Sequence, residues 1–201
     1  MKKNFAFFLQ MAAIVLLCFG FLPESFAEKP IGVGEQVPDF QLFDLDGASH
    51  SFSETKGKIT VFHFWSAKCP FVVRYNDRLN QMAADYVIKG VNVAGINSNV
   101  DETVEQTVTE LGKRGITYPV LMDPNHQVAD LFGAVTTPHV FIIDQSGTLV
   151  YRGAVDDQGW SEDNQPTKNY VNEVLDALLA GEPSPHSETK SVGCTVKRKK
   201  T

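Results

Sequence analysis

An apolar run at residues 58–64 leads straight into a cysteine, a proline and then an amphipathic stretch. The run is almost continuous in apolar side chains, as expected for a strand at the centre of a sheet covered on both faces. Cys69 and Pro70 follow, and apolar residues at 72–86 then recur at helical spacing as far as Gly90. The sequence therefore predicts a buried strand that delivers a cysteine to the start of a helix.

Cys69 is the candidate nucleophile of this chain. Proline is favoured in the first turn of a helix, and the residue before a proline is pushed out of helical geometry, so Cys69 is predicted at the N-cap. Its sulfur would face unpaired backbone N–H groups and the positive end of the helix dipole, which favours the thiolate form of a cysteine. Lys68 adds a nearby positive charge. The alternative is a buried, inert thiol, because free cysteine often behaves as a small hydrophobic residue.

The rest of the chain alternates between strand and helix patterns. Strands are expected at 40–43, 51–53, 91–96, 118–122, 140–143 and 149–152, and helices at 104–115, 128–132 and 171–179. Strand–helix–strand crossovers imply parallel pairing at the centre of the sheet, and the turn at 144–147 joins the last two strands in an antiparallel hairpin. We therefore predict one α/β domain.

The two ends of the chain are predicted to lie outside this domain. Two lysines precede an apolar run that ends in Ser25-Phe26-Ala27, with small residues at 25 and 27, the pattern of a cleavable signal peptide over residues 1–27. An uncleaved membrane anchor is the alternative. The domain is then expected at 28–180, and residues 181–201, rich in Pro, Ser, Thr and Lys, are expected to form a flexible tail. Such a protein would be periplasmic or secreted.

Charge and cysteine content narrow the class of partner. The net charge of −6 at pH 7, without a basic face interleaved with aromatic residues, disfavours nucleic acid. Cys18 would leave with the signal peptide, so the mature chain would hold Cys69 and Cys194. An even number of cysteines in an exported protein suggests a pair, either structural or cycling.

Four segments of the chain resemble the thioredoxin superfamily, and within it the redoxin branch that contains peroxiredoxins and periplasmic thioredoxin-like proteins. They are residues 32–47, residues 62–70 with the active-site cysteine, residues 136–144 with Thr137-Pro138, and residues 191–194 ending in Gly193-Cys194. The resemblance implies a thioredoxin-like three-layer fold, with a central mixed sheet, helices on both faces and an N-terminal hairpin.

The resemblance also implies roles for residues of the active-site loop. Disulfide reductases of the superfamily usually carry Trp-Cys-x-x-Cys, whereas Ser66 stands here at the first cysteine position, which excludes a CxxC dithiol cycle. The loop fits the Thr/Ser-x-x-Cys pattern of peroxiredoxins, in which the hydroxyl positions the peroxide, although Phe62 replaces the expected proline. Arg74, one helical turn after Cys69, is the candidate for the peroxide-activating arginine, with Arg152 as the second candidate.

The substrate is expected to contact residues on both sides of the cysteine. Trp65 and Pro70 flank it in the sequence, and the resemblance implies a cis bond before Pro138 that turns the backbone of Thr137 toward the substrate. No cofactor and no metal are expected. A copper-chaperone hypothesis would have only Cys69 and His139 as ligands.

These features predict an exported thiol-dependent oxidoreductase. In the leading hypothesis it reduces peroxides: the Cys69 thiolate attacks the peroxide, Cys194 resolves the oxidised cysteine, and an unidentified thiol supplies the electrons. One alternative is a thiol–disulfide exchange protein that acts on exported protein substrates. The other is a redox-inert thioredoxin-fold module that holds a peptide in the groove at Pro138.

Overall fold

The computed structural model describes residues 29–199 of the chain. The signal peptide expected at residues 1–27 lies outside the described residues and stays a prediction. Within residues 29–199, no helix combines the length and the apolar character needed to cross a membrane.

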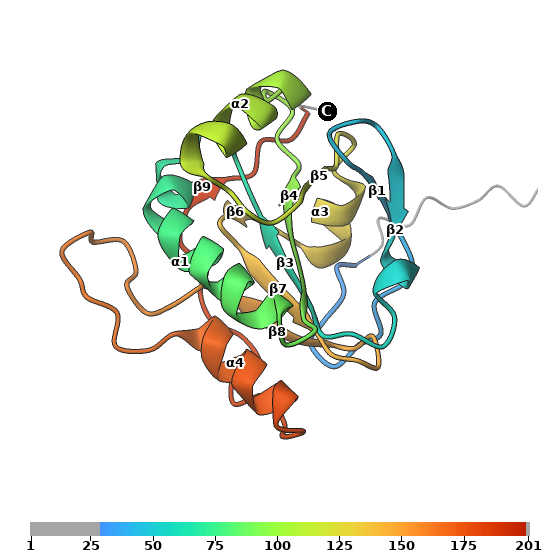
Figure 1. Cartoon of the computed structure of the whole chain (residues 1–201), viewed down its shortest axis with the longest axis vertical. Helices are drawn as coiled ribbons and strands as arrows, with labels where there is room; N and C mark the ends of the chain where they lie inside the picture. Colours follow the sequence, from blue (N-terminus) through green and yellow to red (C-terminus); the bar gives the residue numbers. More distant parts are fainter. Residues whose placement is uncertain (1–28, 200–201) are drawn as a thin grey trace, which may run out of the picture.

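Across the described residues, a mixed seven-stranded sheet forms the middle layer of the fold (Figure 1). Its strands follow the order β2 (Ser49–Ser51), β1 (Gln41–Phe43), β5 (Val120–Met122), β4 (Asn92–Asn97), β3 (Thr60–Phe64), β7 (Val140–Ile143) and β8 (Leu149–Gly153). β3, β4 and β5 run parallel at the centre, whereas the hairpins β1–β2 and β7–β8 are antiparallel at the two edges. The predicted parallel centre and antiparallel hairpin are confirmed.

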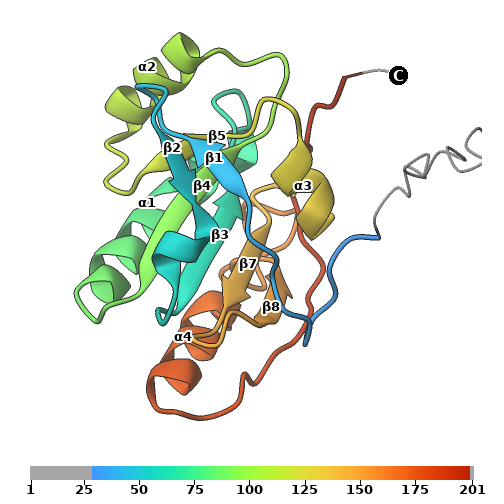
Figure 2. The same cartoon turned by 90° about the vertical axis from the view of Figure 1, so that its right-hand side faces the viewer.

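Helices cover both faces of the sheet. α1 (Pro70–Val87), α2 (Val104–Arg114) and α4 (Tyr170–Leu179) lie on one face, and α3 (Gln127–Phe132) lies on the other (Figure 1, Figure 2). A short 3-10 helix, η1 (Phe52–Thr55), follows β2. This is the three-layer thioredoxin-like arrangement with an N-terminal hairpin that the sequence predicts.

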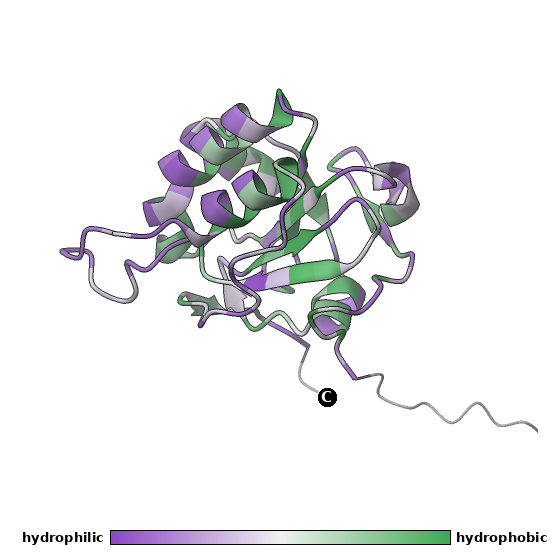
Figure 3. Cartoon of the chain, turned by 90° about the horizontal axis from the view of Figure 1, so that it is seen from below, coloured by the Kyte–Doolittle hydropathy of each residue, from purple (hydrophilic) through white to green (hydrophobic). Residues whose placement is uncertain are grey.

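β3 is buried along its whole length. Val61 belongs to the apolar layer beneath α1 and α4, whereas Phe62 and Phe64 belong to the layer beneath α3. Successive side chains of a strand point to opposite faces, so a strand covered on both sides needs an unbroken apolar run. Figure 3 shows the outcome, with apolar residues concentrated on the sheet and polar residues on the outer faces of the helices.

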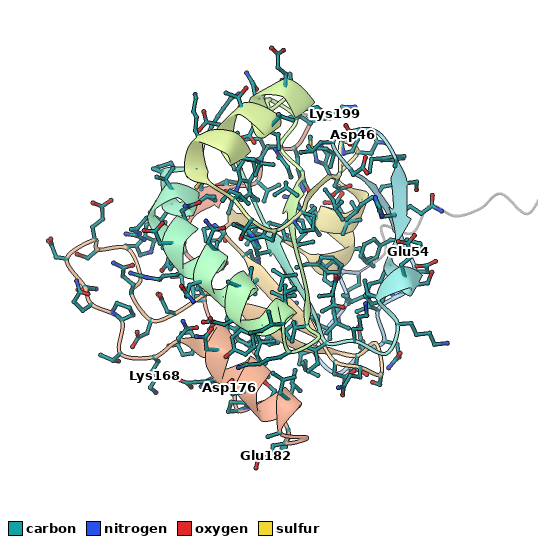
Figure 4. The ribbon with its side chains drawn as sticks, viewed as in Figure 1. Asp46, Glu54, Lys168, Asp176, Glu182 and Lys199 are labelled. Atoms are coloured by element: carbon teal, nitrogen blue, oxygen red, sulfur yellow. The ribbon has the colours of Figure 1, made fainter. Side chains whose placement is uncertain are left out.

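Charged side chains lie at the rim of the molecule. Exposed examples are Asp46, Glu54, Lys168, Asp176, Glu182 and Lys199 (Figure 4). Water solvates charge at these positions, so the charged and polar groups that are buried near the cysteines are the ones that need a structural explanation.

One short element differs from the prediction. The pattern at 51–53 predicts a strand, but only Ser51 belongs to β2, and the chain then turns into η1. The side chains of Ser51 and Glu54 form a reciprocal capping box, which starts a helical turn rather than continuing a strand. Phe52 stacks on Phe40 with ring centroids 5.2 Å apart, so its side chain packs inward from the turn.

The C-terminal segment also differs from the prediction. Residues 181–201 are expected to be flexible, yet the described part of this segment packs along the domain. Its strand β9 (Cys194–Thr195) pairs antiparallel with β6 (Thr136–Thr137), outside the main sheet. Val192 and Val196 are only 8 % and 3 % exposed. A polar composition predicts a flexible segment, but composition carries no information about the long-range pairing of β9 with β6 that holds the C-terminal segment in place.

Two buried histidines make the stability of the domain depend on pH. Burial lowers the pKa of His63 to about 3, and burial together with the charge of Arg152 lowers the pKa of His139 to about 4. In the unfolded chain both histidines titrate near pH 6.5. Between about pH 4 and 6.5 the unfolded state therefore binds protons that the folded state does not, and stability is lost as the pH falls through this window.

We expect the free energy of unfolding to fall by about 2 kcal/mol for each of these histidines between pH 7 and pH 5. In urea unfolding, His63→Phe should recover about half of the combined loss, and it keeps an aromatic ring against Tyr118. His50→Gln is the control, because its hydrogen bond to Asp44 raises the pKa of His50, so its removal cannot flatten the pH dependence. A His63→Phe protein with the pH dependence of the wild type would contradict the prediction.

Candidate active site

Cys69 lies at the N-cap of α1, as the sequence predicts. Its backbone is extended, with φ −83° and ψ 117°, and Pro70 occupies the first helical turn. β3 ends at Phe64, so the loop at 65–68 carries the chain from the carboxyl edge of the sheet into the helix. The Cys69 side chain is 1 % exposed and makes no capping bond to its own helix. Its sulfur instead faces another part of the chain.

The partner of Cys69 is Cys194, 125 positions later in the sequence. The two Sγ atoms are 2.7 Å apart, and both cysteines are free thiols. Cys69 Sγ also lies 3.0 Å from the backbone carbonyl oxygen of Thr137. The pairing of β6 with β9 places Cys194 directly opposite Thr137. Two thiols that are far apart in the sequence are therefore in contact at one end of α1.

The surroundings keep the proton on Cys194. Burial and the hydrogen bond with Cys69 raise the pKa of Cys194 to about 11, against smaller opposing effects from the Phe71 N–H and the charge of Lys197. At neutral pH Cys194 therefore remains a thiol, in contact with the Cys69 sulfur. The two sulfurs differ in setting: Cys194 lies on the C-terminal strand, and Cys69, whose Sγ donates to the Thr137 carbonyl oxygen, lies at the helix N-terminus.

The peptide bond between Thr137 and Pro138 is cis, as the resemblance implies. It follows β6 and precedes β7, whose first residue, Val140, pairs with His63 of β3. Thr137 and Pro138 are buried beside β9, whereas Pro70 is exposed. Three of the predicted substrate contacts are therefore near the thiol pair: Thr137 and Pro138 lie beside β9, and Pro70 follows Cys69 directly.

Ser66 is held by a buried carboxylate that the sequence analysis did not single out. Glu102, 7 % exposed, accepts from the Ser66 hydroxyl at 2.5 Å. It also accepts from the backbone N–H groups of Ala67 at 2.7 Å and Lys68 at 3.1 Å. The side-chain amide of Asn97 adds a fourth bond at 2.9 Å. The Ser66 hydroxyl is thus bonded to a carboxylate that orders the loop, and not directed at the thiol pair.

Arg114 is a second group that the sequence analysis missed. Its side chain is 10 % exposed and donates to the backbone carbonyl groups of Ser66 and Ala67. Glu110 binds the guanidinium at 3.0 Å, and the fully buried Trp65 ring lies 5.5 Å away. Trp65, predicted to contact the substrate, is instead part of the core beneath the loop. A carboxylate for the N–H groups and a guanidinium for the carbonyl groups together hold this loop in one conformation.

Arg74 does not lie where a peroxide-activating arginine is expected. Its guanidinium donates to the backbone carbonyl oxygens of Trp160 at 3.2 Å and Gly159 at 2.9 Å. Arg152, the second candidate, pairs with Glu188 at 2.8 Å. Both arginines bind neighbouring segments, and within the described part of the chain neither is hydrogen-bonded to the thiol pair.

His139 packs in the core next to β7. Its ring lies 4.4 Å from that of Phe141 between centroids, and its Nδ1 accepts from the Val135 N–H at 3.4 Å. Among residues 29–199, no group of three or more His, Cys, Asp or Glu side chains is arranged to hold a metal ion.

The position of Glu102 could have been predicted from the sequence. Glu102 comes a few residues after β4, and the parallel strands β3 and β4 end at the same edge of the sheet. The segment after β4 must therefore lie beside the cysteine loop. Arg114 lies in the last turn of a helix, where a basic residue is ordinary, so nothing marked it.

We expect Glu102→Gln to destabilise the protein by about 1–3 kcal/mol, because an amide presents N–H groups to buried donors that need an acceptor. Urea unfolding measures the change. Glu105→Gln is the matched control, since this exposed glutamate lies in the same region and contributes about 0.5 kcal/mol to the helix start. Equal effects of the two substitutions would show that Glu102 does not hold the loop.

The chain matches known proteins over most of its length. Residues 33–152 match the model of the AhpC/TSA family. The thiol-disulfide oxidoreductase ResA of Halalkalibacterium halodurans is 28 % identical over 152 residues, which cover 74 % of this chain and 85 % of that relative. The crystal structure of a hypothetical protein from Sinorhizobium meliloti 1021 superposes with a TM-score of 0.78 at 31 % identity, covering 86 % of this chain and 98 % of that one.

A third match is a candidate thiol:disulfide interchange protein DsbE from Chlorobium tepidum. Its crystal structure superposes with a TM-score of 0.55 at 26 % identity, over 61 % of this chain and 84 % of that one. The architecture described above and these neighbours agree on a thioredoxin-like fold. Because the family model matches more than half of the chain, this protein belongs to the AhpC/TSA family.

Proposed function

We propose that this protein is an exported thiol–disulfide oxidoreductase that exchanges disulfides with other exported proteins through Cys69 and Cys194. The observation that carries the proposal is the 2.7 Å contact between the two sulfur atoms at the N-terminus of α1. The names of two relatives support it, a thiol-disulfide oxidoreductase and a thiol:disulfide interchange protein. The pair supplies the two thiols of a dithiol cycle although Ser66 stands at the first cysteine position of CxxC.

The reaction consists of two thiol–disulfide exchanges. The Cys69 thiolate attacks one sulfur of a substrate disulfide and forms a mixed disulfide, and the other substrate sulfur leaves as a thiolate that takes up a proton. Cys194 then loses its proton and attacks Cys69 Sγ, which breaks the mixed disulfide and releases the second substrate thiol. The protein ends as a Cys69–Cys194 disulfide and the substrate as a dithiol. An external thiol donor returns the pair to the reduced state by the reverse exchanges.

The electrostatics favour this order of attack. Cys194 keeps its proton while Cys69 is unreacted, because burial and the hydrogen bond with Cys69 raise the pKa of Cys194. Once Cys69 is in a mixed disulfide, its hydrogen bond no longer raises the pKa of Cys194, whereas the Phe71 N–H and the charge of Lys197 still favour a thiolate at Cys194. Cys194 therefore becomes a better nucleophile after Cys69 has reacted.

Reduction of peroxides, the leading hypothesis from the sequence, has less support. The Ser66 hydroxyl is bonded to Glu102, Arg74 binds the carbonyl groups of a neighbouring loop, and Phe62 packs against Phe40. Two of the matched proteins are named as a thiol-disulfide oxidoreductase and a candidate thiol:disulfide interchange protein. Disulfide exchange is therefore the function that we propose, and peroxide is the competing oxidant in its test.

The proposed compartment is the periplasm or the exterior of the cell. The pattern at residues 1–27 supports export, and oxidising compartments are where disulfides form and persist. A protein anchored to the membrane by an uncleaved N-terminal segment would catalyse the same disulfide exchange.

We expect prereduced wild-type protein treated with glutathione disulfide to lose two hydrogens as the Cys69–Cys194 disulfide forms, measured by mass spectrometry. Cys194→Ser should stop at a mixed disulfide on Cys69, because the second exchange has no nucleophile. Cys69→Ser should react little, because burial raises the pKa of the remaining thiol, Cys194, which lies on the C-terminal strand rather than at the helix N-terminus. The two serine variants are matched controls, since each removes one sulfur.

The same three proteins treated with hydrogen peroxide test the competing function. If Cys69 forms a sulfenic acid faster than it forms the mixed disulfide at equal oxidant concentration, the protein is a peroxidase and the proposal is wrong. A Cys69 that is inert toward both oxidants would also contradict it.

A further inference from the structure

We propose that the edge of β6 beside Pro138 is a peptide groove that the chain's own residues 191–197 occupy in place of a substrate. The inference rests on the proposed function and names its substrate class. That class is an extended protein segment with glycine before the reactive cysteine and apolar residues two positions away on each side. Substrate and C-terminal segment exchange places on β6 in each turnover.

Within the described structure, β6 pairs only with β9, in a two-stranded sheet separate from the main one. Thr137 lies opposite Cys194, and the Val196 N–H donates to the Val135 carbonyl oxygen at 3.1 Å. Backbone pairing at an open edge accepts any extended chain, and side-chain pockets then add specificity. A substrate strand in the same register would place its cysteine on Cys69.

The position before the cysteine has no space for a side chain. A Cβ on Gly193 would lie 2.1 Å from the carbonyl oxygen of Thr137 and 2.6 Å from its carbonyl carbon. These atoms belong to the backbone next to Pro138, so they cannot turn aside as the end of a flexible side chain would. Glycine is the residue that allows so close an approach of two backbones. A substrate entering in the same register meets the same limit.

Side chains two positions from the cysteine are buried. Val192 and Val196 are only 8 % and 3 % exposed. Thr195 and Lys197, on either side of Val196 in the sequence, are exposed. This alternation is the period of two of a strand with one covered face. The groove therefore selects apolar residues on both sides of the cysteine.

The site next to Val192 is larger than valine requires. A cavity of about 310 Å³ has Val192, Pro138, Tyr75 and the exposed Trp160 in its wall, and Asp157 and Lys190 are among its other lining residues. A substrate with a larger apolar side chain two positions before its cysteine would fill this space. Such a residue would give a substrate binding energy that the C-terminal segment itself does not use.

The C-terminal segment is also held by contacts outside the groove. Before it, the Ala154 N–H donates to the Thr189 hydroxyl at 2.9 Å, and at its end Arg198 binds Asp130 at 2.8 Å. A substrate cannot reproduce these contacts. Because the segment is tethered, it acts at a local concentration on the order of 1 mM, and a free substrate must compete with it. Covalent capture by Cys69 then retains the substrate.

Exchange of strands links binding to the two chemical steps. While the substrate is joined to Cys69 it occupies β6, and Cys194 reaches Cys69 only as its own strand pairs again. Re-pairing displaces the substrate strand and brings in the attacking sulfur. The Cys69–Cys194 bond forms as the mixed disulfide breaks, and the departing substrate sulfur keeps the electron pair and takes up a proton.

Peptide binding to the full chain tests the groove without redox chemistry. The probe is a fluorescent peptide, Ser-Val-Gly-Ser-Thr-Val-Lys, which copies residues 191–197 with serine in place of the cysteine. Its anisotropy should report binding to Gly193→Ala, whose own segment cannot dock, with an affinity about tenfold or more above that for wild type. Thr195→Ala changes an exposed side chain of the same strand and should behave as wild type. The peptide with alanine for glycine should bind none of these proteins.

The accessibility of Cys69 gives a second measurement on the same variants. In a Cys194→Ser background, adding Gly193→Ala should raise the alkylation rate of Cys69 about tenfold or more, whereas adding Thr195→Ala should not change it. The inference is overturned if the peptide binds Gly193→Ala no better than wild type, or if both peptides bind alike. A protein that binds the peptide as expected but forms no mixed disulfide would refute the proposed function and leave the groove intact.

Discussion

The burial of β3 between two apolar layers is the constraint on which the rest of the site depends. β3 pairs with β4 in parallel and with β7 in the opposite direction, so the end of β3 and the start of β7 meet. His63 therefore lies opposite Val140, two residues after Pro138. This register places the cysteine loop next to the cis peptide, and α1 begins at Cys69 on the far side of that loop. Each large apolar side chain buried in such layers contributes about 1.5–3 kcal/mol, enough to hold the register firmly.

Residues 65–67 of the loop between β3 and α1 are buried, so their backbone groups need partners other than water. Glu102 accepts from its N–H groups, and Arg114 donates to its carbonyl groups. A buried carboxylate is tolerable only when it is well hydrogen-bonded, and the Ser66 hydroxyl supplies one of the four bonds. A thiol at that position would be a much weaker donor. Serine in place of the first CxxC cysteine therefore suits this loop, and the second sulfur comes from the C-terminal strand instead.

Local sequence predicted some parts of this site well and others poorly. The N-cap position of Cys69 follows from steric rules that act between neighbouring residues, and the structure confirms it. Arg74 is on the expected helix and one turn from the cysteine, but its long side chain reaches the loop carbonyl groups of Gly159 and Trp160. Helical spacing sets the face on which a side chain emerges, whereas the partner of an arginine depends on which loop packs against that face.

The sequence by itself determined the order of strands and helices, the parallel centre of the sheet and a cysteine at a helix start. These features depend on periodicity, proline geometry and short connections, all of which act over a few residues. Only the tertiary structure decided that the C-terminal segment docks on β6 and that Ser66 is bonded to Glu102. The first contact joins cysteines 125 positions apart through a two-residue strand, and the second joins residues 36 positions apart. A two-residue strand and a single hydrogen bond are too short to leave a periodic pattern in the sequence. They form only where packing of the larger elements has already brought the two segments together.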